Sequence, residues 1–395
     1  MDWTIWVEWI IKSILLILIL LGGFAYLTLF ERKVLARIQV RIGPNRTGPW
    51  GLLQPIADAV KLIFKEELTP AQAYKIIFVL APIITVVPAI VVAAVIPWGQ
   101  VVSIFGREVT LYIADLNVGL LYVTAITSIA IYGITLAGWS SNNKYALLGG
   151  LRASAQMISY ELALGFSFVT AIILAGSMRM IDIVEAQRAV YYLQLGNFQI
   201  PIPMWNAIIQ PVGAFIFLIA TLAEVNRAPF DMPEAEQELT AGYHAEYSGM
   251  KFALFFMAEY IKMIVISAIA VVLFFGGYLG PDITKLPLIG QYLTWLAPWM
   301  GPVYMFIKIV ALLFVMVWVR ATLPRIRYDR LMLLGWKVLL PLTLALAFIS
   351  AVGVLLAQDV NPALIWLVPV VSVGAGFVTI GLVDRSLRRK AYAAR

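Results

Sequence analysis

Long runs of apolar residues separated by short polar segments set the pattern of this 395-residue chain. Because about 20 mostly apolar residues span a bilayer as a helix, the pattern predicts an all-α polytopic membrane protein forming a single membrane domain over 1–395. The first run is too long for a removable signal peptide and lacks a small-residue cleavage site, so we expect it to remain. The fifth run is interrupted by Gln210-Pro211, as expected for a helix that lines a cavity. The nine runs are 9–30, 76–97, 118–139, 156–176, 206–223, 252–277, 302–319, 334–357 and 361–383.

The polar segment 224–251 concentrates acidic residues between two apolar runs and reads EVNRAPFDMPEAEQELTAGYHAEYSGMK. A solvated loop is one interpretation. We favour a segment packed beside the bilayer, because Pro229 and Pro233 restrict the backbone and Phe230 places apolar bulk among the acids. Carboxylates buried there must pair, take up a proton or face water. The acidic residues are Glu224, Asp231, Glu234, Glu236, Glu238 and Glu246.

The segment 31–75 combines turn residues with an amphipathic repeat. Gly43-Pro44-Asn45 and Gly48-Pro49 indicate turns. The spacing after them predicts a helix at the cytoplasmic membrane surface, with Leu52, Leu53, Ile56, Val60, Ile63 and Phe64 on one face and Gln54, Asp58, Lys61 and Lys65 on the other. This helix is either an interfacial anchor or, with nearby arginines, the rim of an opening to the lipid. The residues of that rim would be Arg32, Arg37, Arg41, Asp58 and Lys61.

Ionisable residues in or beside the apolar runs are candidate functional residues, because such groups are unfavourable in the membrane interior. Glu161, in the fourth run, is either a functional acid or a neutral acid hydrogen-bonded between helices. Glu259 and Lys262 are spaced i, i+3 and can pair, as a structural neutralisation or within a proton path. Glu224 and Arg227 lie on adjacent helical positions and could exchange protons.

Charge and composition indicate the orientation and limit the chemistry. Most of the 29 lysines and arginines follow the first, third, fifth and seventh runs or lie in the C-terminal tail. The positive-inside rule therefore places the N-terminus outside and the C-terminus and segment 224–251 in the cytoplasm, and the net charge of +7 needs no nucleic acid. The basic segment 320–337 either complements the acidic one or extends its side chains to anionic lipid. Without cysteine and with one histidine, His244, we expect no metal and no bound cofactor, and no glycine-rich loop indicates a nucleotide.

The polar segments together resemble the H-type or subunit 1 family of proton-pumping NADH:quinone oxidoreductase, respiratory complex I. The resemblance is carried, in family order, by ERK with RIGPNRTGPWGLLQPIADAVKLIFKE, by SNNKYALLGGLRASAQMISYE, by AEVNRAPFDMPEAEQEL with EYSGMKFALFFMAEY, and by RATLPRIRYDRLMLLGWK. It implies eight core transmembrane helices, with an extra C-terminal helix and tail over 361–395. It also implies a subunit without a redox centre in a quinone-reducing, proton-translocating enzyme of the bacterial plasma membrane.

The resemblance further implies the substrate, the partners and the site residues. The substrate is ubiquinone or menaquinone, and the partners are membrane lipid, the peripheral-arm iron–sulfur subunits, and the small and antiporter-like membrane subunits. The quinone tunnel and its entrance would be bordered by Arg32, Arg41, Asp58, Lys61 and Phe64. The loop beneath the quinone cavity would contain Glu224, Arg227, Asp231, Glu234, Glu236 and Glu238. The carboxylates that couple quinone reduction to proton translocation would be Glu161, Glu224, Glu246 and Glu259.

Two alternatives and two unusual positions remain open. The same module occurs in relatives of complex I with another electron donor, such as membrane-bound hydrogenases or reduced-coenzyme dehydrogenases. A stand-alone ion transporter is disfavoured because the two halves share no repeated motif. Lys262 departs from the family pattern and could partly neutralise Glu259. His244 is either a satisfied polar group or a proton relay.

Overall fold

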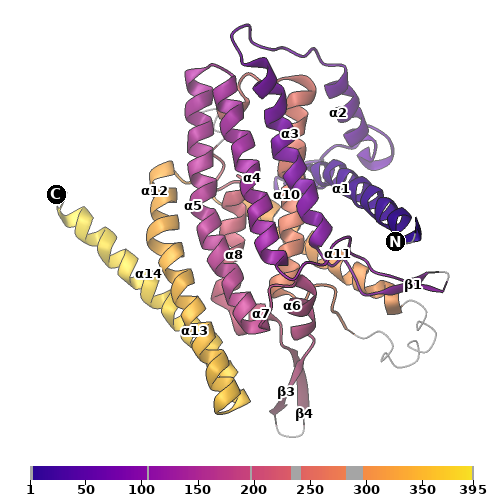
Figure 1. Ribbon diagram of the computed structural model, residues 1–395. Coiled ribbons are helices and arrows are strands. Elements are labelled where there is room, and N and C mark those ends of the chain that lie inside the picture. The colour runs from indigo at the N-terminus through magenta and orange to yellow at the C-terminus, as the bar shows by residue number, and fades with distance from the viewer. Residues whose placement is uncertain (1–2, 105, 196–197, 233–241, 282–296, 394–395) are drawn as a thin grey trace.

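The computed structural model describes residues 3–104, 106–195, 198–232, 242–281 and 297–393 (Figure 1). Within these residues the chain is mainly helical, and eight helices are long and apolar enough to cross a membrane. This confirms the predicted all-α polytopic fold. The eight helices are Trp6–Ile38, Lys75–Val95, Gly119–Ser140, Lys144–Ala175, Gly249–Phe274, Pro298–Thr322, Tyr328–Asp359 and Pro362–Val383.

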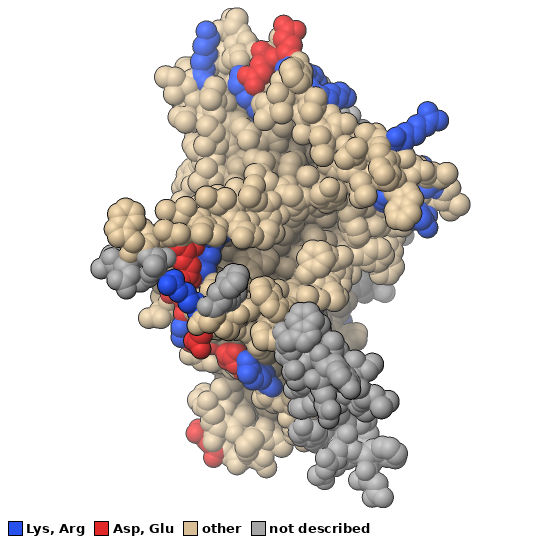
Figure 2. All heavy atoms as spheres, turned by 90° about the vertical axis from the view of Figure 1, so that its right-hand side faces the viewer, with Lys and Arg blue, Asp and Glu red and all other residues tan. Residues whose placement is uncertain are grey.

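α1 (Trp3–Ile38) lies at one edge of the bundle and leaves much of its surface uncovered. Figure 2 views this side and shows a broad band without charged side chains between charged groups nearer the two ends. A contiguous apolar surface of this kind suits contact with lipid or with another subunit. Its exposed side chains on α1 include Trp6, Ile10, Ile14, Leu18, Ile19 and Tyr26.

The predicted amphipathic helix is confirmed as α2 (Gln54–Ile63). A 3₁₀ turn (Pro49–Gly51) precedes it, and Gly51 has φ 76°. A Cβ at Gly51 would lie 2.3 Å from the Pro44 carbonyl oxygen, so the turn requires glycine. The described chain leaves the apolar side chains of this segment exposed, as either predicted role of the helix requires. They are Leu52, Leu53, Ile56, Val60, Ile63 and Phe64.

Four helices form the centre of the bundle, and α10 is the most buried of the spans, with 78% of its most apolar 18 residues inside the protein. α5 begins well before the expected start at 156, because glycines let its polar first turns pack closely. A Cβ at Gly149 would lie 2.6 Å from Gly242, and one at Gly138 would lie 2.6 Å from the Ala146 carbonyl oxygen. The four central helices are α3 (Lys75–Val91, continued by a 3₁₀ turn, Val92–Val95), α4 (Gly119–Ser140), α5 (Lys144–Ala175) and α10 (Gly249–Phe274) (Figure 1).

The fifth predicted span is instead two shorter helices, α7 (Asn206–Ile209) and α8 (Pro211–Glu224). Gln210, with φ −130° and ψ 66°, separates them, which confirms the predicted interruption. Its side chain donates a hydrogen bond to the hydroxyl oxygen of Ser350 at 2.7 Å. At 1.5 Å per residue α8 is about 21 Å long, short of the bilayer core of about 30 Å. α8 therefore ends inside the bundle (Figure 1).

The last two helices, α13 and α14, lie on the side of the bundle away from α1, and α14 is the additional C-terminal helix expected over 361–395 (Figure 1). α14 is the least buried of the spans, at 11% of its most apolar 18 residues. It therefore presents most of its apolar surface outward. The elements after α10 are α11 (Ala297–Thr322), α12 (Tyr328–Leu334), a π-helical turn (Gly335–Leu339), α13 (Leu340–Asp359), a 3₁₀ turn (Pro362–Trp366) and α14 (Leu367–Ala393).

Two antiparallel hairpins and α6 (Met180–Ala186) lie at the end of the bundle opposite the start of α5 (Figure 1). The hydrophobic pattern did not predict these hairpins, because their strands are short and lie outside the apolar runs. β1 (Val102–Ile104) pairs with β2 (Arg107–Val109), Val102 facing Val109. β3 (Val190–Leu195) pairs with β4 (Phe198–Pro203), Val190 facing Pro203.

Lys308 of α11 caps the end of α10. Its ammonium group donates hydrogen bonds to the carbonyl oxygens of Phe275 at 2.7 Å, Gly277 at 2.9 Å and Leu279 at 2.6 Å. Carbonyl groups at a helix C-terminus have no partner within the helix and attract a cation. The position of Lys308 inside a span is thus explained by capping.

Candidate functional site at the end of α8

The chain that leaves α8 is packed between helices. Val225, Arg227 and Phe230 are only 2%, 3% and 4% exposed. The amide nitrogen of Gln156 in α5 donates to the carbonyl oxygens of Ala223 at 2.9 Å and Phe230 at 2.7 Å, which holds this loop. The favoured interpretation of a packed segment is confirmed for 225–232. Predictions for Glu234, Glu236 and Glu238 concern positions outside the described residues.

The basic segment 320–337 contacts this loop, although the contacts are made to its backbone and not to its acidic side chains. The Arg325 guanidinium donates to the carbonyl oxygen of Asp231. Alongside, the backbone N–H of Ile326 donates to the carbonyl oxygen of Pro229 at 3.1 Å. These are contacts of the loop backbone, so they hold the loop in place by geometry as much as by charge.

Arg227 is the centre of a buried charge cluster. Its Nε lies 2.8 Å from Glu259 Oε1 on α10, and its Nη1 lies 3.3 Å from Glu31 Oε1 on α1. The guanidinium carbon lies 4.4 Å from the centre of the Tyr260 ring. Two carboxylates and an aromatic face around one guanidinium suit its planar shape and delocalised charge.

Glu31 is shared by a second cation and a hydroxyl. The Tyr260 hydroxyl donates to Glu31 Oε2 at 2.7 Å, and Arg320 at the end of α11 pairs with Glu31 Oε1. Burial by itself lowers the pKa of Arg227, but the carboxylates of Glu259 and Glu31 outweigh burial and raise it above its usual value. Arg227 is therefore a permanent cation that joins α1 and α10.

Glu31 and Arg320 belong to this cluster but were not among the predicted site residues. Both lie where a long apolar run meets polar sequence, in the motifs ERK and RAT, and such positions are usually solvated. Their opposite charges at the ends of the first and seventh runs were the available signal. Only the packing of α1 beside α11 shows that they meet.

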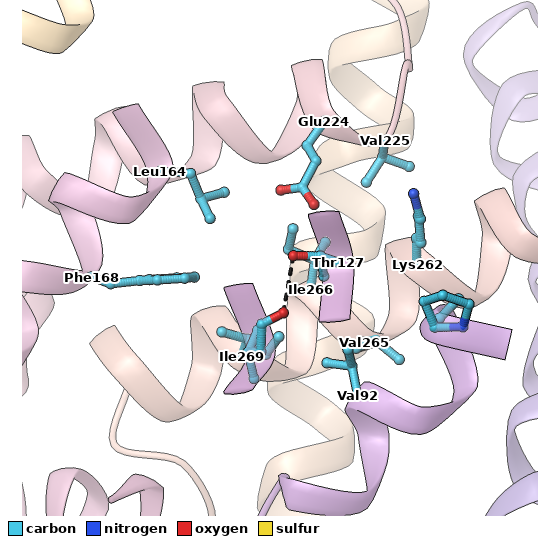
Figure 3. A pocket seen from close by; sticks show the side chains of 13 residues that line it. Val92, Thr127, Leu164, Phe168, Glu224, Val225, Lys262, Val265, Ile266 and Ile269 are labelled. Atoms are coloured by element: carbon cyan, nitrogen blue, oxygen red, sulfur yellow. Dashed lines mark hydrogen bonds between the residues drawn. The ribbon is translucent and has the colours of Figure 1, made fainter. Parts of the chain in front are cut away.

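Two further charged residues, Glu224 and Lys262, lie next to this cluster without forming an ion pair within 4.0 Å. Both line two cavities of about 20 Å³ each, which also share Val225. Figure 3 shows Glu224 reaching into the first cavity from α8 and Lys262 from α10, with Thr127 of α4 nearby. The second cavity is more polar and is lined also by Thr85, Asn226, His244 and Glu259. Each cavity has room for about one water molecule.

The ion pairs differ from those that local spacing indicated. Glu259 pairs with Arg227 rather than with its i+3 neighbour Lys262, and Lys262 shares its cavities with Glu224. Among the described residues, no cation lies within 4.0 Å of the Glu224 carboxylate, so the expected Glu224–Arg227 pair does not form. The loop that follows α8 turns Arg227 away from α8 toward α1 and α10.

The other predicted carboxylates lie on different sides of this region. Glu161 of α5 accepts a hydrogen bond from the Ser128 hydroxyl of α4, and it is one of the charged neighbours of Lys262. Glu246 instead accepts from the Asn143 amide at 2.8 Å, next to the start of α5. The structure thus brings Glu161, Glu224 and Glu259 around Lys262 and leaves Glu246 outside the lining of both cavities.

His244 lines the polar cavity and is surrounded by aromatic rings. Its ring centre lies 3.8 Å from that of Tyr243 and 5.7 Å from that of Phe255. Burial lowers the pKa of His244 to about 3, so the ring is neutral at physiological pH. Its Nδ1 is buried, and no hydrogen-bond partner for it exists in the described part of the chain. The described residues thus do not provide the partner that a satisfied polar group would have at Nδ1.

The residues predicted for the opening to the lipid divide into two sets. The Arg32 guanidinium donates to Asp58 Oδ2 at 2.7 Å, and the Gln54 amide donates to Asp58 Oδ1 at 3.0 Å. Asp58 thus points toward α1, whereas the Phe64 side chain is 84% exposed. The bonds of Arg32, Gln54 and Asp58 hold the polar face of α2 against α1, and the apolar face of α2 remains exposed. The other predicted rim residues are exposed: Arg37, Arg41 and Lys61.

This arrangement is suited to holding and moving protons. A carboxylate and an amine beside water-sized cavities can change protonation with little movement, and the neighbouring Arg227 cluster keeps the surrounding charge constant. Thr85, Thr127 and Asn226 add hydroxyl and amide groups that can orient water. The chemistry that the described site offers is therefore proton transfer between buried acids.

Comparison with known proteins shows to which family the chain belongs. The family profile described as NADH dehydrogenase matches residues 11–351. The H-type subunit of NADH-quinone oxidoreductase from Thermomicrobium roseum is 50% identical over 344 residues, which cover 87% of this chain and 95% of that protein. An H-type subunit of the same enzyme from Geobacter metallireducens is 50% identical over 333 residues, covering 84% and 92%. One from Syntrophobacter fumaroxidans is 47% identical over 356 residues, covering 90% and 98%.

Proposed function

Because the chain belongs to the NADH dehydrogenase family, we propose that it is the membrane subunit of a proton-translocating NADH:quinone oxidoreductase. In this proposal it forms the quinone entrance and the lower part of the quinone chamber. The subunit has no redox centre of its own. Iron–sulfur subunits of the peripheral arm reduce ubiquinone or menaquinone in the chamber that this subunit helps to form. Small and antiporter-like membrane subunits are the other proposed partners.

The observation that carries the proposal is the set of buried charges running from the loop after α8 into the membrane helices. Arg227 in the loop contacts Glu259, Glu259 lines the cavity that holds Lys262 and Glu224, and Glu161 neighbours Lys262 from α5. Buried ionisable groups inside spans are unfavourable unless they have a function. A charge change at the loop can therefore reach acids inside the membrane through direct neighbours.

The α1–α2 arm supports the quinone part of the proposal. Quinone reduction needs protons and creates transient negative charge on a small headgroup, whereas the isoprenoid tail requires an apolar path from the lipid. The exposed apolar face of α2, with Ile56, Val60 and Ile63, offers such a path. The Arg32–Asp58 pair beside it offers polar groups at the entrance.

The first experiment is purification of the chain from its native membrane in mild detergent, followed by identification of what copurifies. The expected result is a complex that contains iron–sulfur and antiporter-like subunits and reduces quinone with NADH. This activity should be sensitive to rotenone or piericidin and should acidify proteoliposomes. A stable lone chain that moves ions in liposomes would contradict the proposal and favour a transporter.

The orientation is also part of the proposal: the N-terminus outside and the segment 224–251 in the cytoplasm of a bacterial plasma membrane. The chain has no cysteine, so single cysteines can be introduced on an unlabelled background. We expect a cysteine at exposed Val40 to react with a membrane-impermeant maleimide in inverted vesicles and not in intact cells. A cysteine at exposed Trp3 should show the opposite pattern. Equal labelling of both from one side would contradict this orientation.

A further inference from the structure

Lys262 is a buried cation without a bonded partner in the described structure. Its side chain lies in the centre of α10 and is 9% exposed. It donates no hydrogen bond to the described residues, and none of their carboxylate oxygens lies within 4.0 Å of its ammonium group. Glu224 Oε2 is likewise buried, and no hydrogen-bond partner for it lies among those residues. Both groups face shared cavities, where water or each other in another rotamer can serve as a partner.

The balance of charge around Lys262 is uneven. In the neighbouring cluster, Glu31 and Glu259 are matched by Arg227 and Arg320. Once Glu259 is paired with Arg227, Glu224 and Glu161 are the acidic neighbours of Lys262 that remain among the described residues. Two acids then compete for one ammonium group in a low-dielectric interior, where an uncompensated carboxylate is strongly disfavoured. One of the two acids is therefore expected to carry a proton.

Lys262 is also suited to move between these acids. A lysine carries a compact charge on a flexible stem with four carbons, whereas the planar Arg227 is held by fixed neighbours. The acids lie on different helices, Glu224 on α8 and Glu161 on α5. Of the other groups that line the two cavities, α3 contributes Thr85 and α4 contributes Thr127, and neither is charged. The other titratable groups that line the polar cavity are Tyr243, His244 and Glu259, and Glu259 is already paired with Arg227.

We propose that Lys262 is a movable counter-ion that alternates between Glu224 and Glu161 and thereby links their protonation. A proton that arrives at Glu224 from the polar cavity neutralises that carboxylate and releases the ammonium group. Lys262 then pairs with Glu161, which gives up its proton on the side of α4, where Ser128 contacts it. One proton enters and one leaves, and the lysine keeps its own proton. Lys262 acts as a positioning residue, and this role rests on the proposed function.

The test uses the whole complex in inverted membrane vesicles with Lys262→Met and Lys262→Arg. Lys262→Met should lower both NADH:quinone turnover and proton pumping by about tenfold, a change typical of an energetically coupled residue. Lys262→Arg keeps the positive charge but replaces the compact ammonium group by a planar guanidinium, so this variant should pump at an intermediate rate. The matched control is Lys251→Met on the same helix, because Lys251 pairs with Glu67 outside both cavities. It should stay within about twofold of wild type, because this pair is partly exposed on its Glu67 side and lies away from both cavities.

The outcomes separate this inference from the proposed function. If the wild-type complex neither reduces quinone nor pumps protons, the proposed function fails before any variant is compared. If the wild type pumps and Lys262→Met pumps equally well, Lys262 is not the counter-ion. If Lys262→Arg equals wild type while Lys262→Met fails, Lys262 is a static neutralising charge and the alternation is wrong.

A second measurement does not depend on the assembly of Lys262 variants. Infrared difference spectra of the wild-type complex, reduced minus oxidised, should show one protonated-carboxyl band that is lost and another that is gained. Glu224→Gln should remove one band and Glu161→Gln the other, because the two acids exchange the protonated state. Spectra in which neither substitution changes a carboxyl band would overturn the proposal.

Discussion

Arg227 and Lys262 are two buried cations in adjoining regions, and their surroundings differ in kind. Arg227 is held by Glu259, Glu31 and the ring of Tyr260. Lys262 faces cavities that it shares with Glu224 and has no bonded partner among the described residues. The first region is a closed cluster of matched charges, whereas the second is an open site with room for water. The contrast shows that the first region fixes the loop, and it supports the proposal that the second can change its protonation.

The largest expected effect is that of breaking the closed cluster. In the Arg227→Met variant, Glu31 keeps its ion pair with Arg320, but Glu259 loses its 2.8 Å ion pair with Arg227. Removing one partner of a buried ion pair typically costs about 3–5 kcal/mol of stability. We expect a marked drop in the thermal stability of the purified complex and loss of quinone reduction. Arg37→Met, at an exposed arginine of α1, is the control, and equal stability of the two variants would refute the anchoring role of Arg227.

A smaller effect is expected from His244, which tests the open site by pH. The unfolded histidine titrates near its ordinary pKa of 6.5 and the folded one near 3, so between these values the unfolded chain binds a proton that the folded protein does not. Stability is therefore full above pH 6.5 and falls on acidification, by about 2 kcal/mol at pH 5.

His244→Phe should remove this part of the pH dependence while keeping the aromatic packing. The measurement is the unfolding midpoint of wild type and variant at about pH 7.5 and about pH 5, on either side of the ordinary histidine pKa. A wild-type midpoint that drops no more than that of the variant would show that His244 is not buried in its neutral form.

Next in size is the effect of Glu224→Gln, which removes one of the two acids beside Lys262. The substitution keeps the shape of the side chain but prevents its ionisation. We expect proton pumping per NADH to fall by about tenfold, or about 1.4 kcal/mol in coupling, with little change in stability. Proton release in vesicles, measured together with NADH oxidation, provides this ratio. Intact coupled pumping would show that Glu224 is not needed for translocation.

The smallest stability effect is expected where charges pair at the surface. Arg32 and Asp58 are 51% and 34% exposed in their side chains. Exposed ion pairs contribute about 0–1 kcal/mol, so Asp58→Asn should hardly change the melting temperature. If the pair borders the quinone entrance, the apparent KM for quinone should rise while NADH oxidation with an artificial acceptor stays unchanged. A large loss of stability with an unchanged KM would assign Asp58 a structural role instead.

These contrasts also show how far prediction from sequence reaches. The long apolar runs, the amphipathic helix and the interruption at Gln210 were predictable, because hydrophobic periodicity and proline act locally. The burial of 225–232 was also predictable, because exposing the apolar Phe230 to water is unfavourable and the neighbouring prolines restrict the backbone. The partners in the buried ion pairs were harder to predict from the sequence. Spacing along one helix favoured Glu259–Lys262, but Arg227 from another segment took Glu259.

The sequence by itself determined that this protein is a polytopic helical membrane protein and which acids lie at membrane depth. Its recognisable motifs also determined its family. Tertiary structure alone decided that Glu31 and Arg320 join Arg227, that Glu246 lies apart, and that Glu224 shares its cavities with Lys262. The physical reason is that burial in lipid depends on local composition, whereas ion pairing depends on how helices from distant parts of the chain are rotated against one another. That rotation is set by close packing, such as the approach of Gly138 in α4 to Gly150 in α5, and a local sequence pattern does not reveal it.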